Sequence, residues 1–341
     1  MAMIQNTMNS QIAFPKIYAS EKESNRPLWS VMIPTFNGAE FLAATLAGVL
    51  SQAFPPGEMQ IEVLDDGSDD ETEQIVEQVG KGRILFHRNI QRLGLVGNWN
   101  ACLERANGHW VHILHQDDIV LDGFYSTMKA AIEANRVVGA AFCRYSYIDG
   151  NSNCLNLAGL ERETVGILNN WLERIAVVQL IQFPSMVVKR SVYEKLGGFC
   201  IAAHYAADWE MWKRIARYYP VCYVPDMLAG YRLHTGSETS RLVNSGRNLA
   251  DIRSSVTISK SYLPVESVEK WSSQALECCA LRATADAREM LKDGKWRVGT
   301  LQVYEALHTS CSVRVLFSLF FVALAGFRAV LRSLHKHFKR S

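Results

Sequence analysis

The first 120 residues alternate short apolar strands with amphipathic helices, and this order constrains the fold more than any other feature of the chain. Strands are predicted at Trp29–Ile33, Ile61–Leu64, Arg83–His87 and Trp110–Leu114. Helices are predicted between them at Glu40–Gln52, Asp70–Val79 and Asn98–Ala106. Strands separated by helices of about 10–15 residues pair in parallel, because each helix carries the chain back along the sheet. The sequence therefore predicts an α/β fold with a mostly parallel central sheet.

Polar side chains stand where each of these strands ends. They are Thr35 and Asn37, then Asp65 and Asp66, then Asn89, then Gln116, Asp117 and Asp118. Parallel α/β sheets bind their ligands at the carboxyl ends of the strands. We therefore expect these side chains to share one site.

The charge and the cysteines exclude some classes of protein. A net charge of +2 gives no basic field of the kind that holds nucleic acid, so no nucleic-acid partner is expected. The eight cysteines include no C-x-x-C pair, which argues against a structural zinc site and favours free thiols in a reducing cytosol. Met1 to Arg26 is polar and has no apolar segment like that of a signal peptide.

The second half of the chain is expected to be less regular and then wholly helical. Its predicted elements are a helix at Phe124–Asn135, strands at Ala140–Tyr147 and Phe183–Lys189, and helices at Ser191–Leu196, Asp208–Tyr218, Val268–Lys292 and Val298–Leu307. We expect a loose leader over residues 1–27 and one large domain over 28–240, divided into two halves (28–120 and 121–240). A helical extension (241–310) and a membrane-associating tail (311–341) would follow.

Asp65-Asp66-Gly67-Ser68-Asp69-Asp70 directly follows a buried strand. Two adjacent carboxylates at a strand end are costly unless they meet donors or a metal ion, and a nucleotide base and ribose hydroxyls would be suitable donors. The alternative is a simple turn followed by an acidic helix cap.

His115-Gln116-Asp117-Asp118 follows the apolar strand that ends at Leu114. Oxygen ligands at a strand end suit Mg²⁺ or Mn²⁺, hard cations that also bind phosphate oxygens. Such a cation would neutralise a departing diphosphate. The alternative is an exposed acidic turn.

Asp208, in Ala207-Asp208-Trp209-Glu210, opens a predicted helix. Its carboxylate is positioned to take a proton from an acceptor hydroxyl. The alternative is that Asp208 only caps the helix.

Together these segments resemble the family-two glycosyltransferases of the GT-A fold. The resemblance rests on Val31 to Asn37, Asp65 to Thr72, Asn89 with Gly94, Asn98 and Asn100, His115 to Asp118, Asp208 to Glu210, and Tyr231 to His234. It covers about residues 28–240. It implies that residues 28–240 form a GT-A catalytic domain, with a nucleotide-sugar-binding half (28–120) and an acceptor-binding half (121–240), followed by a helical C-terminal extension.

The resemblance also implies a role for particular positions. Donor binding is expected of Pro34, Thr35, Phe36, Glu40, Asp65, Asp66, Asn98 and Asp117. Asp118 and His234 would bind the metal, Mn²⁺ or Mg²⁺, and Asp208 would be the general base of one-step inverting transfer. His115 stands where the family has the first acid of its metal motif. Histidine is a poorer partner for Mg²⁺ than for Mn²⁺, so the identity of the first ligand stays open.

Val315 to Phe327 is a nearly continuous apolar run followed by basic residues. It is shorter than the ~18 residues that usually span a bilayer. An interfacial helix whose basic end faces anionic headgroups fits better, with packing in the core as the alternative.

The sequence thus predicts an inverting, metal-dependent glycosyltransferase that moves a sugar from a nucleotide-diphosphate donor to a hydroxyl. The acceptor would be a saccharide or lipid-linked saccharide, as in polysaccharide, O-antigen or other cell-surface glycan synthesis. The protein is expected in the cytoplasm, peripheral at the inner face of the membrane. Two alternatives stay open. A nucleotidyltransferase would normally need a lysine-bearing phosphate loop, which Pro34 to Gly38 lacks, and a silent sugar-binding or scaffolding protein would not need a base such as Asp208.

Overall fold

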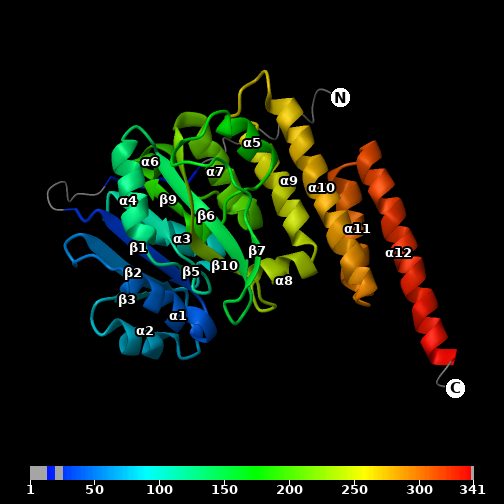
Figure 1. Cartoon of the computed structure of the whole chain (residues 1–341), viewed down its shortest axis with the longest axis horizontal. Coiled ribbons are helices and arrows are strands. Elements are labelled where there is room, and N and C mark those ends of the chain that lie inside the picture. Colours follow the sequence, from blue (N-terminus) through cyan, green and yellow to red (C-terminus); the bar gives the residue numbers. More distant parts are fainter. Residues whose placement is uncertain (1–13, 20–25, 339–341) are drawn as a thin grey trace. The chain divides into compact units, whose positions relative to one another are not determined.

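The structure, a computed structural model, describes residues 14–19 and 26–338, and its first half contains the predicted block of parallel strands (Figure 1). The strands are β1 (Trp29–Thr35), β2 (Met59–Asp65), β3 (Leu85–Arg88) and β4 (Trp110–Ile113). The connecting helices are α1 (Ala39–Leu50), α2 (Thr72–Gly80) and α3 (Gly94–Arg105). Every residue of β1 is buried, as expected of a strand with helices on both faces.

The whole sheet has ten strands, and the order along its main path is β3-β2-β1-β4-β9-β6-β10-β5. The remaining strands are β5 (Ile119–Val120), β6 (Ala140–Ile148), β7 (Cys154–Leu157), β8 (Gly166–Ile167), β9 (Met186–Lys189) and β10 (Val221–Arg232). β9 is antiparallel to both β4 and β6, whereas β6 and β10 pair in parallel. From β3 to β10 only β9 runs against the others, so this part of the sheet is mostly parallel as predicted.

Two layers of helices cover this sheet. Val31 and Ile33 of β1 share one apolar cluster with Leu46 of α1 and Phe124 of α4 (Phe124–Ala134). α3 contacts β1, β2 and β4, and none of its buried residues belongs to that cluster, so α3 covers the opposite face. Trp99 of α3 packs there against Phe183 and Phe199.

Several elements of the second half differ from the predicted ones. The strand predicted at Phe183–Lys189 begins only at Met186, because Phe183–Ser185 forms the short 3₁₀ helix η1. The long strand β10 was not predicted, nor were β5, β7 and β8. The other helices of this region are α5 (Trp171–Val177), α6 (Arg190–Leu196), the 3₁₀ helix η2 (Ile201–Ala206) and α7 (Ala207–Tyr218).

The chain divides into two compact units. The sheet unit comprises Met1–Trp171, Leu180–Ile201 and Met211–His234, and the helical unit comprises Leu172–Gln179, Ala202–Glu210 and Thr235–Ser341. The predicted domain boundaries remain predictions beside this division. Residues 14–19 of the predicted loose leader are packed within the sheet unit, where Ile17 is buried and the Gly198 N–H donates to the Pro15 carbonyl. Most of the leader lies outside the described residues.

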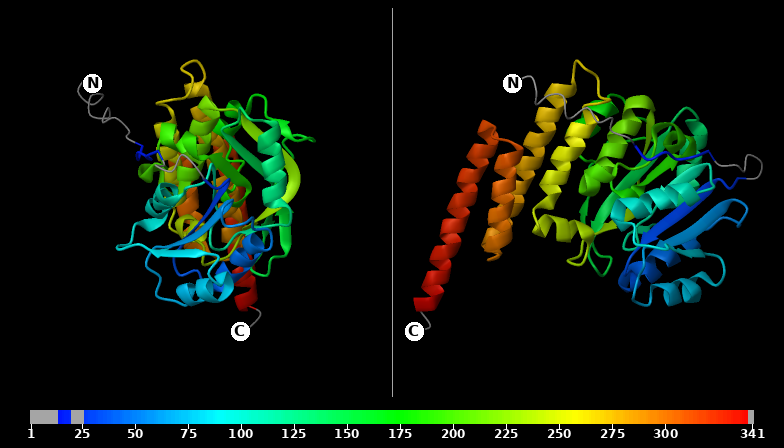
Figure 2. Two further views of the ribbon diagram at one scale, coloured as in Figure 1. Left: turned by 90° about the vertical axis from the view of Figure 1, so that its left-hand side faces the viewer. Right: turned by 180° about the vertical axis from the view of Figure 1, so that it is seen from behind.

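Long helices form the helical unit (Figure 2). They are α8 (Glu238–Asn244), α9 (Arg247–Ser259), α10 (Val268–Lys292), α11 (Trp296–Thr309) and α12 (Val313–Phe338). Ala280 and Ala283 of α10 and Ala306 of α11 pack with Leu249 of α9 and Val315 of α12. These four helices therefore share one apolar core. Among the described residues, none of the helices combines the length and apolar character that a membrane span needs.

Candidate active site

The carboxyl edge of the parallel strands brings the predicted site segments of the sheet unit together. Thr35 at the end of β1 is in register with Asp65 at the end of β2, and Asp65 with Arg88 at the end of β3. β4 lies on the other side of β1 and leads into the turn at residues 115–118. The predicted meeting of strand ends is therefore what the fold produces.

Both carboxylates of the Asp65-Asp66 pair are buried and hydrogen-bonded. Asp65 accepts hydrogen bonds from the N–H and hydroxyl of Ser68 and from Arg88 Nε at 2.6 Å. Asp66 accepts from the backbone N–H groups of Leu93 at 2.7 Å and Gly94 at 2.8 Å. These donors offset the cost of burying two adjacent charges, and they fix the loops after β2 and β3.

Asn89 and Asn98 extend this network. Asn89 Nδ2 donates to Asp66 Oδ1 and to Asn98 Oδ1, both at 3.0 Å, and Asn98 Nδ2 donates to the Leu64 carbonyl at 3.0 Å. Asn98 is buried. Its side chain is not exposed at the surface, and it supports the loop that would face a nucleotide.

The loop from Phe36 to Ala39 is held by side chains from elsewhere in the site. The Gln116 side chain makes two hydrogen bonds with the backbone of Phe36. Its Oε1 accepts from Phe36 N at 2.8 Å, and its Nε2 donates to Phe36 O at 3.1 Å. A Cβ at Gly38 would lie 2.5 Å from Gln116 Oε1, so a larger residue there would displace the Gln116 side chain from Phe36. The Arg92 guanidinium lies 3.6 Å from the centre of the Phe36 ring.

Sequence reasoning gave Gln116 no role beyond its place at a strand end, and gave Arg92 none. Of the other predicted donor residues in this region, Pro34 is buried within β1, and the Thr35 hydroxyl donates to the Ile33 carbonyl at 3.2 Å. Glu40 is exposed on the first turn of α1.

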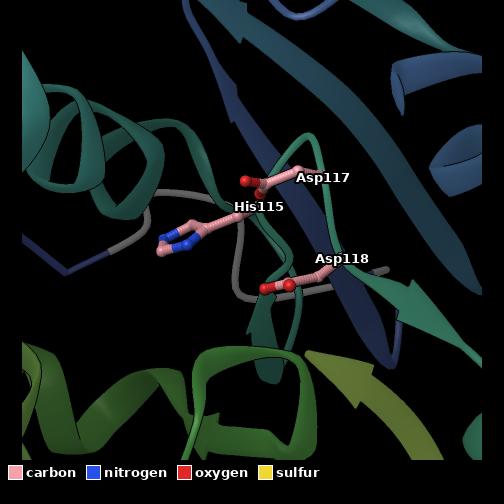
Figure 3. A group of neighbouring side chains, drawn as sticks. All are labelled: His115, Asp117 and Asp118. Carbon is pink, nitrogen blue, oxygen red and sulfur yellow. The ribbon is translucent and has the colours of Figure 1, made fainter. Parts of the chain in front are cut away.

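The turn after β4 carries a group of possible metal ligands, His115, Asp117 and Asp118 (Figure 3). One ligand atom from each lies within 4.8 Å of the other two. Thr45 of α1 positions the turn, because its hydroxyl lies 2.8 Å from the Gln116 carbonyl and 2.7 Å from the Asp118 carbonyl.

Asp118 is 1% exposed, and its two oxygens differ. Oδ1 accepts a hydrogen bond from Arg232 N at 2.9 Å, whereas Oδ2 is buried without a hydrogen-bond partner among the described residues. Burial, together with the negative charge of Asp117, raises the pKa of this carboxyl. A buried carboxylate oxygen of this kind suits a cation as its partner.

His234 and Arg232 brace the turn from the end of β10. His234 Nε2 lies 2.8 Å from Asp117 Oδ2. The Arg232 Nε donates to the Asp117 carbonyl at 2.7 Å, and its Nη1 donates to the carbonyls of Asp149 and Gly150. The sequence pattern included Arg232 but gave it no separate role.

We expect Arg232→Met to lower the free energy of unfolding by about 2–4 kcal/mol, because the buried Arg232 side chain is the donor to the carbonyls of Asp117, Asp149 and Gly150. The midpoint of urea unfolding measures this change. Arg241→Met is the control, because Arg241 is exposed and its ion pair with Glu238 should contribute about 1 kcal/mol or less. Equal midpoints for the two variants would contradict the bracing role of Arg232.

The predicted base, Asp208, belongs to the helical unit. It is half-buried in the first turn of α7, and its Oδ2 accepts a hydrogen bond from Gln179 Nε2 at 2.8 Å. Its Oδ1 lies 2.6 Å from Trp209 N. Glu210, the rival carboxylate two residues on, is 0% exposed. Of the two, only Asp208 is partly exposed.

Comparison with known proteins places this geometry in context. A family description, "Glycosyl transferase family 2", matches residues 30–197. The GalNAc(5)-diNAcBac-PP-undecaprenol beta-1,3-glucosyltransferase of Campylobacter jejuni is 35% identical over 144 residues, which is 41% of this chain and 43% of that protein.

Solved structures show the same fold. Staphylococcus aureus TarS residues 1–349, in complex with UDP-GlcNAc, superimposes with a TM-score of 0.64 at 16% identity, covering 92% of this chain and 91% of that one. The mannosyltransferase PcManGT of Pyrobaculum calidifontis, with GDP-Man and Mn²⁺, does so with a TM-score of 0.56 at 18% identity, covering 91% and 84%.

The parallel strand block with an acidic turn at its carboxyl edge is the GT-A glycosyltransferase fold. Residues 30–197 belong to glycosyl transferase family 2. The protein is accordingly a glycosyltransferase, which confirms the class of enzyme predicted from the sequence.

Proposed function

We propose that the protein transfers a sugar from a nucleoside-diphosphate donor to an acceptor hydroxyl with inversion at the anomeric carbon, assisted by a divalent cation. The observation that carries this proposal is the buried, unpartnered Asp118 Oδ2, close to His115 and Asp117 at the carboxyl edge of the sheet. A general base on α7 completes the chemistry. Its product would belong to a cell-surface glycan.

The donor would bind over the ends of β1, β2 and β4. Its proposed contacts are Pro34, Thr35, Phe36, Glu40, Asp65, Asp66, Asn98 and Asp117. Asp65, Asp66 and Asn98 fix the loops around the nucleotide through the hydrogen bonds described above. The backbone of Phe36 is hydrogen-bonded to Gln116, and the Phe36 ring is available for stacking on the nucleotide. UDP-GlcNAc in TarS and GDP-Man in PcManGT support a donor of this class.

The residues of the turn suit a divalent cation, because Asp118 Oδ2 and His115 Nε2 are buried and have no hydrogen-bond partner in the described part of the chain. Asp118 is the proposed direct ligand, and His234, which contacts Asp117, completes the site. When bound, the cation would be Mn²⁺ or Mg²⁺ and would neutralise charge on the leaving diphosphate. The Mn²⁺ in the PcManGT complex supports this assignment.

Asp208 is the proposed general base. An acceptor hydroxyl is a weak nucleophile at neutral pH, so its proton must leave as the new glycosidic bond forms. The N-terminus of α7 favours the ionised carboxylate, and Gln179 orients it. The proton passes to Asp208, and the diphosphate leaves with the electrons of the anomeric C–O bond.

A direct assay tests this function. The protein is incubated with UDP-, GDP- and dTDP-sugars, with Mn²⁺ or Mg²⁺, and with saccharide or lipid-linked saccharide acceptors. NMR then assigns the anomeric configuration of the product. Inversion with one donor is the expected result. Retention of configuration, or turnover unaffected by EDTA, would contradict the proposal.

We also propose that α12 lies on an anionic membrane surface, close to a lipid-linked acceptor. Val315 and Val322 on one side of α12 are buried in the helical unit. On the other side an outer stripe is exposed, consisting of Val313, Leu316, Phe317, Phe320, Phe321 and Leu324. Residues 313–341 include Arg and Lys but no Asp or Glu. An apolar stripe on a purely basic segment fits an anionic interface, and the undecaprenol-linked substrate in the name of the Campylobacter relative supports a membrane acceptor.

Replacing Phe317 and Phe320 with serine should weaken binding to anionic vesicles at least ~10-fold, because two apolar side chains leave the bilayer interface. Co-sedimentation with anionic and with zwitterionic vesicles measures binding. The double change Leu85→Ser and Ile90→Ser is the control, because both residues are exposed and lie in the sheet unit. Unchanged vesicle binding by the α12 variant would exclude the outer stripe as the membrane contact.

A further inference from the structure

His115 stands out among the side chains of the metal turn because its Nε2 is buried and has no hydrogen-bond partner among the described residues. A buried imidazole nitrogen without a partner is costly, and native proteins seldom keep one without a ligand or another purpose. Asp118 Oδ2, the other unpartnered polar atom of the turn, is in the same condition. Two orphaned atoms of different chemistry in one turn point to one shared ligand.

The ring of His115 is held in place by aromatic side chains. It stacks on Trp99 with ring centres 5.3 Å apart and planes at 17°, and its centre lies 4.4 Å from that of Phe183. A neutral imidazole held in this way offers one nitrogen lone pair to a metal.

The other histidine of the site is differently placed. His234 Nε2 lies 2.8 Å from Asp117 Oδ2, so its contact is with a carboxylate. The group whose ligand atoms lie within 4.8 Å of one another is His115, Asp117 and Asp118. His115 is thus the histidine that the geometry brings to both carboxylates (Figure 3).

We propose that His115 is a direct ligand of the divalent cation, and that its nitrogen makes the site select transition-metal ions such as Mn²⁺ over Mg²⁺. This inference rests on the proposed metal-assisted function and adds its ligand set and selectivity. Imidazole nitrogen suits first-row transition metals, whereas Mg²⁺ demands oxygen ligands and keeps much of its water. Replacing a carboxylate ligand by imidazole also leaves one less negative charge beside the diphosphate.

Pulsed electron paramagnetic resonance of the full chain with MnCl₂, alone and with UDP or GDP, tests the ligand directly. A coordinated imidazole gives ¹⁴N modulation of the Mn²⁺ signal. We expect the modulation in the native protein and in His109→Gln, a change outside the turn, and its loss in His115→Gln and His115→Asp with Mn²⁺ still bound. Modulation that persists in both His115 variants but disappears in His234→Gln would overturn the assignment.

Calorimetry measures the selectivity of the site between Mn²⁺ and Mg²⁺. The ratio of the Mg²⁺ to the Mn²⁺ dissociation constant should fall ~10-fold or more in His115→Asp, because an oxygen replaces the nitrogen. An unchanged ratio would overturn the selectivity, and Mn²⁺ binding without ¹⁴N modulation in the native protein would overturn the ligand while leaving the proposed function intact. Failure of the native protein to bind Mn²⁺ under any of these conditions would overturn both. His115→Gln is uncharged, so it remains informative if the aspartate does not fold in the aromatic surroundings.

Discussion

Asp208→Asn is expected to lower the rate of sugar transfer by at least ~10²-fold while leaving nucleotide binding unchanged. Asparagine keeps the shape of the side chain but cannot accept a proton. Because Gln179 and the Trp209 N–H contact the carboxylate on different oxygens, the amide retains only one of these acceptors, and the rest of the first turn of α7 stays in place. Initial rates at saturating donor, with nucleotide affinity from calorimetry, measure the two quantities separately.

Two further variants decide where the base lies. Glu238→Gln changes another acid in the first turn of a helix of the helical unit and should leave transfer unaltered. Glu210→Gln is the competing assignment, but Glu210 is fully buried, and its change should act on stability before chemistry. Near-native transfer by Asp208→Asn, with loss in Glu210→Gln, would move the base to Glu210. Activity in both would remove the base from this segment.

The strand–helix order of the first 120 residues could be predicted because its signals are local. Apolar runs ending at Pro34, at Asp65-Asp66-Gly67 and at His115 mark the strand ends, and the helices between them repeat their apolar residues at helical spacing. The structure places the ends of β1, β2 and β4 at or within two residues of these positions.

β10 could not be predicted in the same way. Pro225 and Asp226 interrupt its apolar pattern, and the pairing with β6 shifts register between Val224 and Met227, so the strand contains an irregularity that a periodicity search reads as a break. The antiparallel insertion of β9 between β4 and β6 likewise depends on tertiary pairing. Neither has a signal within a short window of sequence.

The candidate site was likewise predictable only in part. Its acids and their place at strand ends were predicted, but their partners were not, because those partners come from distant parts of the chain. Gln116 contacts Phe36 across 80 residues, and Arg232 reaches Asp117 across 115. Spacing along a sequence gives candidate ligands, whereas sheet register decides which of them meet.

The composition of the α12 segment did not predict that one side of the helix is buried while the other is exposed. The apolar run from Val315 to Phe327 was interpreted as an interfacial helix, with core packing as the alternative. The structure gives α12 both a buried side, with Val315 and Val322, and an exposed outer stripe. A truncation at Ser312 would therefore remove core contacts as well as the stripe, which is why point changes in the stripe are the sharper test.

Asp118→Asn is expected to abolish the tightening of nucleotide binding by Mn²⁺ and to lower transfer by ~10²-fold or more, because charge on the leaving diphosphate is then no longer neutralised. The change removes the charge but keeps an oxygen that can accept the hydrogen bond from Arg232 N. Metal affinity itself should fall at least ~10-fold.

The stability of this variant separates a metal ligand from a structural acid. Burial raises the pKa of Asp118, so an uncharged amide at this position should cost the metal-free protein nothing. We therefore expect Asp118→Asn to unfold in EDTA at a urea midpoint equal to or above that of the native protein, and to lose the stabilisation that Mn²⁺ with UDP gives the native protein. Asp122→Asn, an exposed acid four residues on, is the control and should keep that stabilisation. A variant that is destabilised in EDTA yet still stabilised by Mn²⁺ with UDP would show that Asp118 holds the turn together and that the cation binds elsewhere.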